Sequence, residues 1–163
     1  MEKMIIDNDT FFADVLQVLD QGKRVTIPVK GFSMLPFIRG GKDLVVLEKP
    51  GMDLKVDDIV LFHLGPREGG RYVMHRILSI DGDAVDIMGD GVPKNHEYVR
   101  RDQILARAVE ILRGGKRPVD PYGPGQIRLV RFWQWLRPVR RYILLIYRHL
   151  PWNRSWIKEN RNI

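Results

Sequence analysis

The amino-acid sequence contains no cysteine in 163 residues. This absence excludes a disulfide-stapled scaffold, a cysteine nucleophile, and zinc or iron–sulfur centres held by thiolates. Long apolar runs are also missing, because no stretch approaches the roughly 18 to 20 apolar residues that span a bilayer. The first fourteen residues hold one lysine and four acidic residues, a composition that is wrong for a signal or transit peptide. We therefore expect a cytoplasmic protein without a membrane-spanning segment.

Acidic residues are scarce in one part of the chain only. Residues 117–163 hold ten Lys and Arg against two Asp and Glu, whereas residues 1–116 hold 17 against 18. The net charge of +7 therefore comes from the C-terminal part, which also contains all four tryptophans. The 44% of apolar residues suffices for a buried core. We predict a domain over residues 1–116 and a basic tail over residues 117–163.

Apolar periodicity predicts a short helix followed by a series of strands. Apolar side chains recur every three or four residues over Thr10–Asp20, and Gly22 follows as a stop signal. Short apolar segments between Gly, Asp and Pro turns then favour antiparallel β-structure. We expect a mainly β domain, a coiled antiparallel barrel or sandwich, with a short N-terminal helix and a basic helical C-terminal tail. The predicted strands are Arg24–Val29, Asp43–Leu47, Ile59–His63, Tyr72–Ile80, Ala84–Met88 and Ile104–Leu112.

The basic tail predicts two helices, Gln126–Leu136 and Pro138–Leu150. At 100° per residue, Arg140, Arg141 and Arg148 fall on one side of the second helix. Apolar residues fall on its opposite side. The second helix is therefore predicted to be amphipathic.

Three interpretations of this tail stay open. The arginines, together with Trp133 and Trp135, are typical of helices that lie on an anionic membrane surface. Arginines interleaved with aromatic residues also bind nucleic acids, but no helix-turn-helix or RNA-binding signature accompanies them, which disfavours a nucleic-acid partner. In the third interpretation the helices fold back on the β-domain, bury their apolar sides and leave the arginines in solvent.

The segment Gly31–Pro36 holds a serine in a tight turn rich in Gly and Pro. Such a turn holds the Ser33 hydroxyl out from the backbone, and the Ser33 backbone N–H can then help to stabilise an oxyanion. Serine is a weak nucleophile and needs a neighbouring base to take its proton. Of the four histidines, we select His75, in the middle of a predicted strand, as the candidate base.

Asp90 lies between two glycines, 15 residues after His75. An imidazole changes charge near neutral pH, and a carboxylate on its far nitrogen fixes its tautomer and orientation. Taken singly, a serine in a turn, a histidine in a strand and an aspartate between glycines are more often structural than catalytic. It is the three residues together, in this order, that indicate a nucleophile, a base and an orienting acid.

The ordered set Gly-x-Ser-Met-x-Pro, Val-x-His-Arg-Ile and Gly-Asp resembles the type I signal peptidases and their relatives. The resemblance covers residues 26–111. More narrowly, the chain is similar to the endoplasmic-reticulum and archaeal members, in which histidine replaces the general-base lysine. The wider clan includes the self-cleaving LexA-like repressors. The resemblance implies a serine endopeptidase with Ser33 as nucleophile, His75 as base and Asp90 as the acid that orients the base.

The same resemblance implies a substrate groove. Gly31, Met34 and Pro36 would shape the turn and the groove. An extended peptide would lie beside the strands that begin at Arg24 and Tyr72, where main-chain hydrogen bonds hold it. The implied substrate is a peptide or a precursor protein.

Some positions depart from the family pattern. Asp57 stands where the family has a glycine at a strand start, and His96 stands where the endoplasmic-reticulum members have a second Asp. Gly31 lacks the hydroxyl that some bacterial members supply to the oxyanion hole. Signal peptidases also carry a membrane-spanning helix, which this sequence lacks.

These departures leave alternatives to a peptidase open. A non-catalytic peptide-binding or regulatory module on the same fold is the main alternative. A nucleic-acid-binding protein is a third hypothesis and rests on the tail alone. We expect no metal and no cofactor, because the histidines and carboxylates lack the spacing of zinc or calcium sites.

Overall fold

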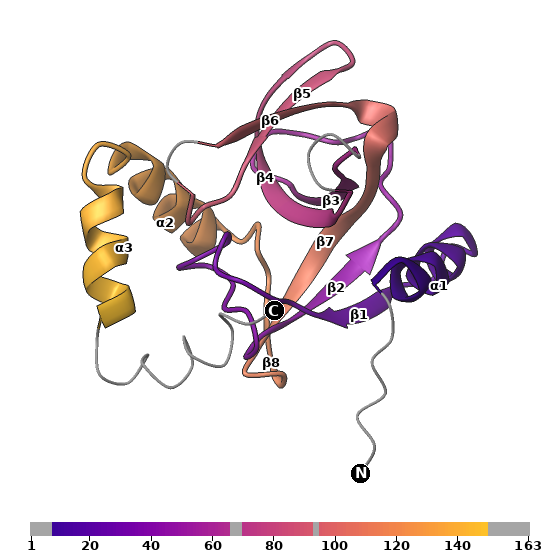
Figure 1. Ribbon diagram of the computed structural model, residues 1–163, viewed down its shortest axis with the longest axis horizontal. Helices are drawn as coiled ribbons and strands as arrows, with labels where there is room; N and C mark the ends of the chain where they lie inside the picture. Colours follow the sequence, from indigo (N-terminus) through magenta and orange to yellow (C-terminus); the bar gives the residue numbers. More distant parts are fainter. Residues whose placement is uncertain (1–7, 66–69, 93–94, 150–163) are drawn as a thin grey trace.

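The computed structural model describes residues 8–65, 70–92 and 95–149, and its main element is an antiparallel eight-stranded sheet (Figure 1). The strands are β1 (Val25–Pro28), β2 (Leu44–Glu48), β3 (Ile59–His63), β4 (Tyr72–Asp81), β5 (Ala84–Met88), β6 (His96–Arg100), β7 (Ile104–Arg113) and β8 (Arg117–Val119). The α-helices within these ranges are α1 (Asn8–Asp20), α2 (Pro124–Trp135) and α3 (Arg140–His149).

The sheet is open. Its strand order is β1-β2-β7-β3-β4-β5-β6, with β8 paired to β7. In the described part of the chain, β1 pairs only with β2, and β6 pairs only with β5. The prediction of a mainly β, antiparallel domain is confirmed. The expected barrel is corrected to an open sheet, because no described pairing joins β1 to β6.

Strand β3 lies inside the sheet and contributes to a buried cluster on each face. Its side chains alternate between the faces, with Ile59 and Leu61 in one cluster and Val60 and Phe62 in the other. Helix α1 covers the first cluster, where its Leu19 is buried. The apolar periodicity of α1 therefore faces the sheet, as the sequence predicts.

The helices α2 and α3 lie together on the side of the molecule opposite α1 (Figure 1). Val130 and Trp133 of α2 and Leu144 of α3 form a buried cluster with Leu35 and Phe37. The last two residues belong to the segment that carries Ser33. The C-terminal helices therefore pack directly on the candidate serine loop.

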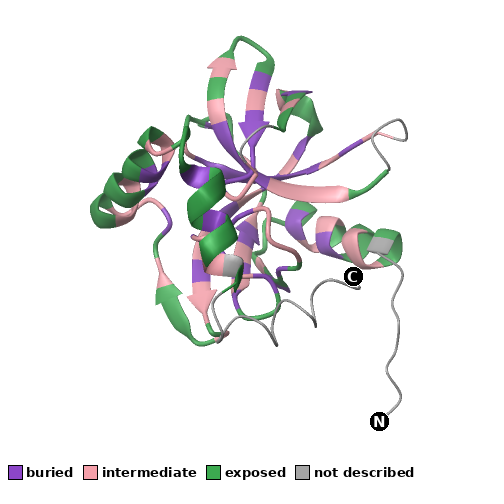
Figure 2. Ribbon diagram, turned by 60° about the vertical axis from the view of Figure 1, so that its left-hand side comes forward, coloured by how far each residue is buried: buried purple, intermediate pink, exposed green. Residues whose placement is uncertain are grey.

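The burial of Arg140 and Trp133 departs from the membrane interpretation, which places both on the surface, and the burial of Arg140 also departs from the fold-back interpretation. Arg140 and Trp133 are buried, whereas Arg141 and Trp135 are exposed. The side chain of Arg148 lies outside the described residues. The apolar side of α3, which the fold-back interpretation expects to be buried, is largely exposed (Figure 2). Within the described ranges, no helix is long and apolar enough to cross a membrane.

The predicted boundary between residues 116 and 117 lies at the end of a tight turn. Residues 114–116 form the turn between β7 and β8, and β8 pairs with β7. The basic region 117–163 therefore begins with a strand of the sheet before its helices start.

Candidate active site

Ser33 lies in the loop between β1 and β2, and the loop is closed at its base. Gly41 N donates a hydrogen bond to Val29 O at 2.7 Å. Gly31 has a φ of 77°, in the left-handed region that glycine adopts without a steric penalty. Ser33 itself is half-buried. The loop therefore holds Ser33 at the edge of the core in a half-buried position, as the turn residues predict.

Met34 does not have the role that the resemblance implies. Its side chain is buried in the core cluster under α1, and its carbonyl accepts hydrogen bonds from the N–H groups of Phe37 and Ile38. A side chain inside the core cannot line an open groove, so Met34 anchors the loop instead. Gly31 and Pro36, the other two groove candidates, are half-buried in the loop.

The turn after β5 lies directly against the serine loop. Gly91 N donates to Ser33 O at 2.7 Å. A Cβ on Gly89 would stand 2.4 Å from Ser33 O and 2.9 Å from His75 Nε2, and a Cβ on Gly91 would stand 2.5 Å from Phe32 O. Atoms in closely packed interiors do not approach this near, so both positions require glycine. The serine loop, the His75 ring and the Gly-Asp turn therefore meet at Gly89.

His75 lies in β4 and is 4% exposed. Its Nδ1 lies 2.9 Å from Oε2 of Glu97 on β6. Its Nε2 is buried and has no hydrogen-bond partner in the described part of the chain, so it makes no hydrogen bond to Ser33 Oγ. A carboxylate at Nδ1 favours the tautomer that carries its proton there, which leaves the Nε2 lone pair free. His75 therefore has the arrangement of a general base.

The expected contact of Asp90 with His75 is wrong, because Asp90 pairs with Arg76. Its carboxylate accepts three hydrogen bonds from Arg76 at 2.8–3.2 Å, and both side chains are buried. Successive side chains of a strand point to opposite faces. A carboxylate that accepts hydrogen bonds from Arg76 is therefore not placed to contact His75. Glu97 occupies the orienting position instead.

Arg76 fixes the Gly-Asp turn to the start of β3. Besides its contact with Asp90, Arg76 Nη1 donates to Asp57 O at 2.8 Å. Burial by itself lowers the pKa of Arg76, but the charge of Asp90 and the hydrogen bonds to it outweigh burial and raise this pKa. Asp57 has a φ of 77°, a conformation that favours glycine. This is the position where the resembled family has glycine.

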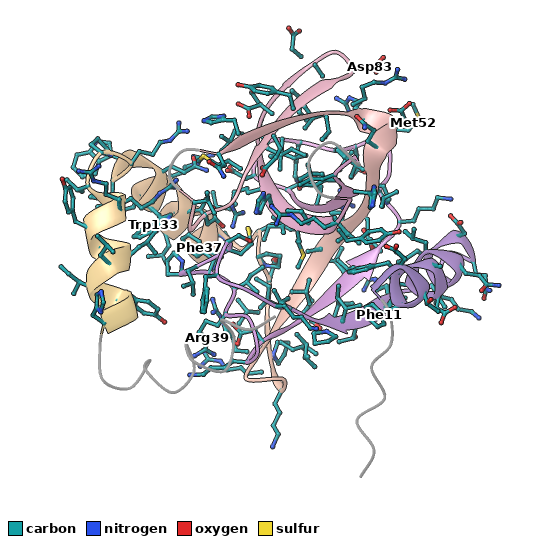
Figure 3. The ribbon with its side chains drawn as sticks, in the orientation of Figure 1. Phe11, Phe37, Arg39, Met52, Asp83 and Trp133 are labelled. Atoms are coloured by element: carbon teal, nitrogen blue, oxygen red, sulfur yellow. The ribbon has the colours of Figure 1, made fainter. Side chains whose placement is uncertain are left out.

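Helix α2 contacts the same turn. Trp133 Nε1 donates to Asp90 O at 2.8 Å. Trp133 also shares a buried cluster with Leu35 and Phe37 of the serine loop, and Figure 3 shows Trp133 and Phe37 next to each other. One side chain of the basic tail therefore holds both loops of the candidate site.

Three residues of the site were missed by reasoning from sequence. Arg76 stands in the motif beside His75, and strand alternation was a signal that one carboxylate could not serve both side chains. Glu97 lies in a polar segment that gave no strand signal. The composition of the tail predicts that Trp133 lies on its surface. The hydrogen bond from Trp133 to Asp90 O becomes visible only in the fold.

Two strand edges have no strand partner in the described part of the chain. The outer edge of β1 is free, because β1 pairs only with β2. In β4, the residues Tyr72–His75 pair only with β3, because the pairing with β5 begins at Arg76. These are the two strands that the resemblance places beside the substrate, and the free part of β4 ends at the candidate base.

Among the described residues, no group of three or more His, Asp or Glu side chains could hold a metal ion. A scan against protein-family models finds no matching family, and a search of curated proteins finds no significant match. The candidate site therefore stands on the geometry of its own residues.

Proposed function

We propose that this chain is a serine endopeptidase that cleaves a peptide or precursor protein and resembles the signal peptidases that use a histidine base. The observation that carries the proposal is the environment of His75. Its Nδ1 faces Glu97 and its buried Nε2 is unpartnered next to the Ser33 backbone. A buried polar atom without a partner is costly, which favours a functional role over a structural one.

In the proposed reaction, Ser33 Oγ attacks the carbonyl carbon of the substrate peptide bond while its proton passes to His75 Nε2. The C–N bond of the tetrahedral intermediate then breaks, and the proton on Nε2 passes to the leaving amine. Water attacks the resulting ester with His75 again as base, and the proton returns to Ser33 Oγ as the ester bond breaks. Glu97 stabilises the imidazolium in both steps. Because Gly31 has no hydroxyl, backbone N–H groups such as that of Ser33 would bind the oxyanion.

The free strand edges support a peptide as the substrate. An extended peptide can add to the outer edge of β1 or to the free part of β4 through main-chain hydrogen bonds. Such hydrogen bonds do not depend on the side chains of the peptide, so they suit a protease that selects by small pockets. A cytoplasmic location stays a prediction of the sequence and part of this proposal.

Hydrolysis of a degenerate peptide library, with new chain ends read by mass spectrometry, tests the proposal. We expect cleavage by the wild type and by Ser79→Ala, which replaces an exposed serine on the same strand as His75. We expect no cleavage by Ser33→Ala. Cleavage that survives Ser33→Ala would contradict the assigned nucleophile.

A non-catalytic peptide-binding module is the second candidate. It is favoured by one observation, that His75 Nε2 makes no hydrogen bond to Ser33 Oγ in the described residues. Catalytic hydrogen bonds are often long before substrate binds, so this geometry is compatible with both functions. If the protein bound library peptides without cleaving them, the result would support the peptide-binding module over the peptidase.

A further inference from the structure

The outward sides of α2 and α3 expose many large apolar side chains. Ile146 is 66% exposed, Tyr142 51% and Leu145 50% on α3, and Trp135 is 74% exposed on α2. We call the whole set the outer helical face, and it consists of Leu129, Phe132 and Trp135 of α2, Val139 of the turn between the helices, and Tyr142, Ile143, Leu145 and Ile146 of α3. Apolar groupings of this kind on a protein surface mark interaction sites.

Helix α3 buries Arg140 and exposes most of its apolar side chains, which departs from the usual orientation of a surface helix. A surface helix normally buries its apolar side and exposes its charged side. In α3 Leu144 and Arg140 point inward, and Arg140 is fully buried against Trp133. The Nε and Nη1 atoms of Arg140 have no hydrogen-bond partner among the described residues. The helix is thus docked with its apolar side outward, although a buried cation is costly.

Charge argues for an anionic occupant of this face. Residues 124–149 contain six arginines and neither Asp nor Glu. On α2, Arg128 and Arg131 are exposed and alternate along the sequence with the apolar residues of the face. Cationic and apolar residues mixed in this way complement anionic lipid headgroups. A second copy of the same face would bring arginines against arginines, which like-charge repulsion disfavours.

Aromatic side chains point to the same occupant. The rings of Phe132 and Trp135 stack with their centroids 5.9 Å apart, and both side chains are exposed. Tryptophan and tyrosine favour the boundary between headgroups and acyl chains. The exposed Tyr142 of α3 adds a third ring to the face.

We propose that the outer helical face binds the surface of an anionic lipid bilayer. The apolar side chains of α3 enter the boundary between headgroups and acyl chains, while Arg128 and Arg131 of α2 contact lipid phosphates. This inference goes beyond the proposed peptidase and does not depend on it. The inactive Ser33→Ala protein is therefore expected to bind membranes as the wild type does.

Flotation of the full-length protein with lipid vesicles tests the proposal. We expect binding to vesicles of phosphatidylcholine with about one-third phosphatidylglycerol and little binding to phosphatidylcholine alone. Ile146→Glu should lower the partition coefficient about tenfold or more, because an isoleucine no longer enters the bilayer. The matched control is Met52→Glu, since Met52 is 100% exposed and lies far from α2 and α3 (Figure 3).

Neutralising the arginines tests the charge argument separately. Arg128→Gln and Arg131→Gln should each lower binding about fivefold, and about 1 M NaCl should weaken it by screening. Circular dichroism of each variant checks that it is folded. Failure of the folded wild type to bind anionic vesicles would overturn the proposal. So would a dimer in light scattering that Ile146→Glu dissociates, because a second copy would then cover the face.

Discussion

At the residue scale, the two carboxylates near the candidate base have separate tasks. Asp90 holds Arg76 and, through its carbonyl, Trp133. In the described part of the chain, the Glu97 carboxylate contacts the Nδ1 of His75. The alternation of side chains along β4 sends His75 and Arg76 to different partners. Loss of Glu97 should therefore affect chemistry, and loss of Asp90 should affect stability first.

We expect Glu97→Gln to slow acylation of Ser33 by about 10²- to 10⁴-fold, because the amide no longer stabilises the imidazolium. The measurement is the rate of Ser33 labelling by a fluorophosphonate probe. A matched control is Asp86→Asn, which removes the carboxylate that contacts the neighbouring His96. An equal loss of rate in both variants would show that the effect is not specific to His75.

We expect Asp90→Asn to destabilise the fold by about 3–5 kcal/mol, because the buried Arg76 loses its charge partner. Urea unfolding followed by tryptophan fluorescence gives this free energy. Arg76→Met together with Asp90→Leu should restore part of the loss, since both buried charges are then removed. If Asp90→Asn abolished labelling of Ser33 without any loss of stability, Asp90 would be the orienting acid after all.

The proposed nucleophile and the proposed base were accessible to sequence reasoning, but the proposed orienting acid was not. Ser33 and His75 lie in motifs with specific neighbours, and the structure brings both to Gly89. Asp90 belongs to the same ordered set of motifs, but its carboxylate pairs with Arg76. Which of the two neighbouring side chains it meets depends on the face of β4 to which each points. Glu97 reaches His75 only because β6 pairs with β5, which is a tertiary event.

At the element scale, Asp43 joins the end of the serine loop to the turn after β7. It is buried and accepts hydrogen bonds from the Arg39 side chain at 2.8 Å and from Gly114 N at 3.0 Å. Burial alone would raise the pKa of Asp43, but these hydrogen bonds outweigh it and the pKa lies below its ordinary value of 3.8. The ionised form therefore stabilises the folded state.

The direction of the Asp43 pKa predicts loss of stability in acid. A lowered folded-state pKa stabilises the fold above the unfolded value of 3.8, and this contribution is lost as the pH falls below it. Asp43→Asn should reduce the free energy of unfolding by about 2 kcal/mol near pH 7, with a smaller difference near pH 3. Asp20→Asn is a control, because Asp20 forms an exposed ion pair with Lys49. A difference that is equal at both pH values would contradict this role.

The strands with strong apolar patterns were predictable, and the polar ones were not. The strand Ile59–His63 is buried along most of its length, and the structure has it over the predicted residues. In β6 only Val99 is buried, so the segment had no apolar alternation to detect. Strand β8 has three residues and includes Pro118. Both missed strands owe their structure to a neighbour in the sheet.

The two tail helices were predicted, but their orientation was not. A helical wheel divides α3 into an arginine side and an apolar side without saying which side faces the protein. The orientation of α3 follows from the cluster of Leu35, Phe37 and Trp133. Leu144 packs into this cluster, whereas Ile146 is left exposed. The buried position of Arg140 was therefore beyond sequence reasoning.

At the scale of the whole molecule, the uneven charge along the sequence corresponds to one region of the structure. The region up to residue 116 is nearly neutral, and the positive charge lies in the region that carries α2 and α3. These helices sit on one side of the open sheet and contact the candidate site through Trp133 (Figure 1). The proposed bilayer surface and the proposed active site are therefore linked by the buried cluster of Leu35, Phe37, Val130, Trp133 and Leu144.

The central claim is that His75 activates Ser33. The most direct measurement is the rate at which a fluorophosphonate probe labels Ser33, with the labelled residue identified by peptide mass spectrometry. We predict labelling of Ser33 in the wild type and none at this residue in His75→Ala, because the serine then has no base. Absence of Ser33 labelling in the wild type between about pH 6 and pH 9, or an equal rate in His75→Ala, would contradict the claim.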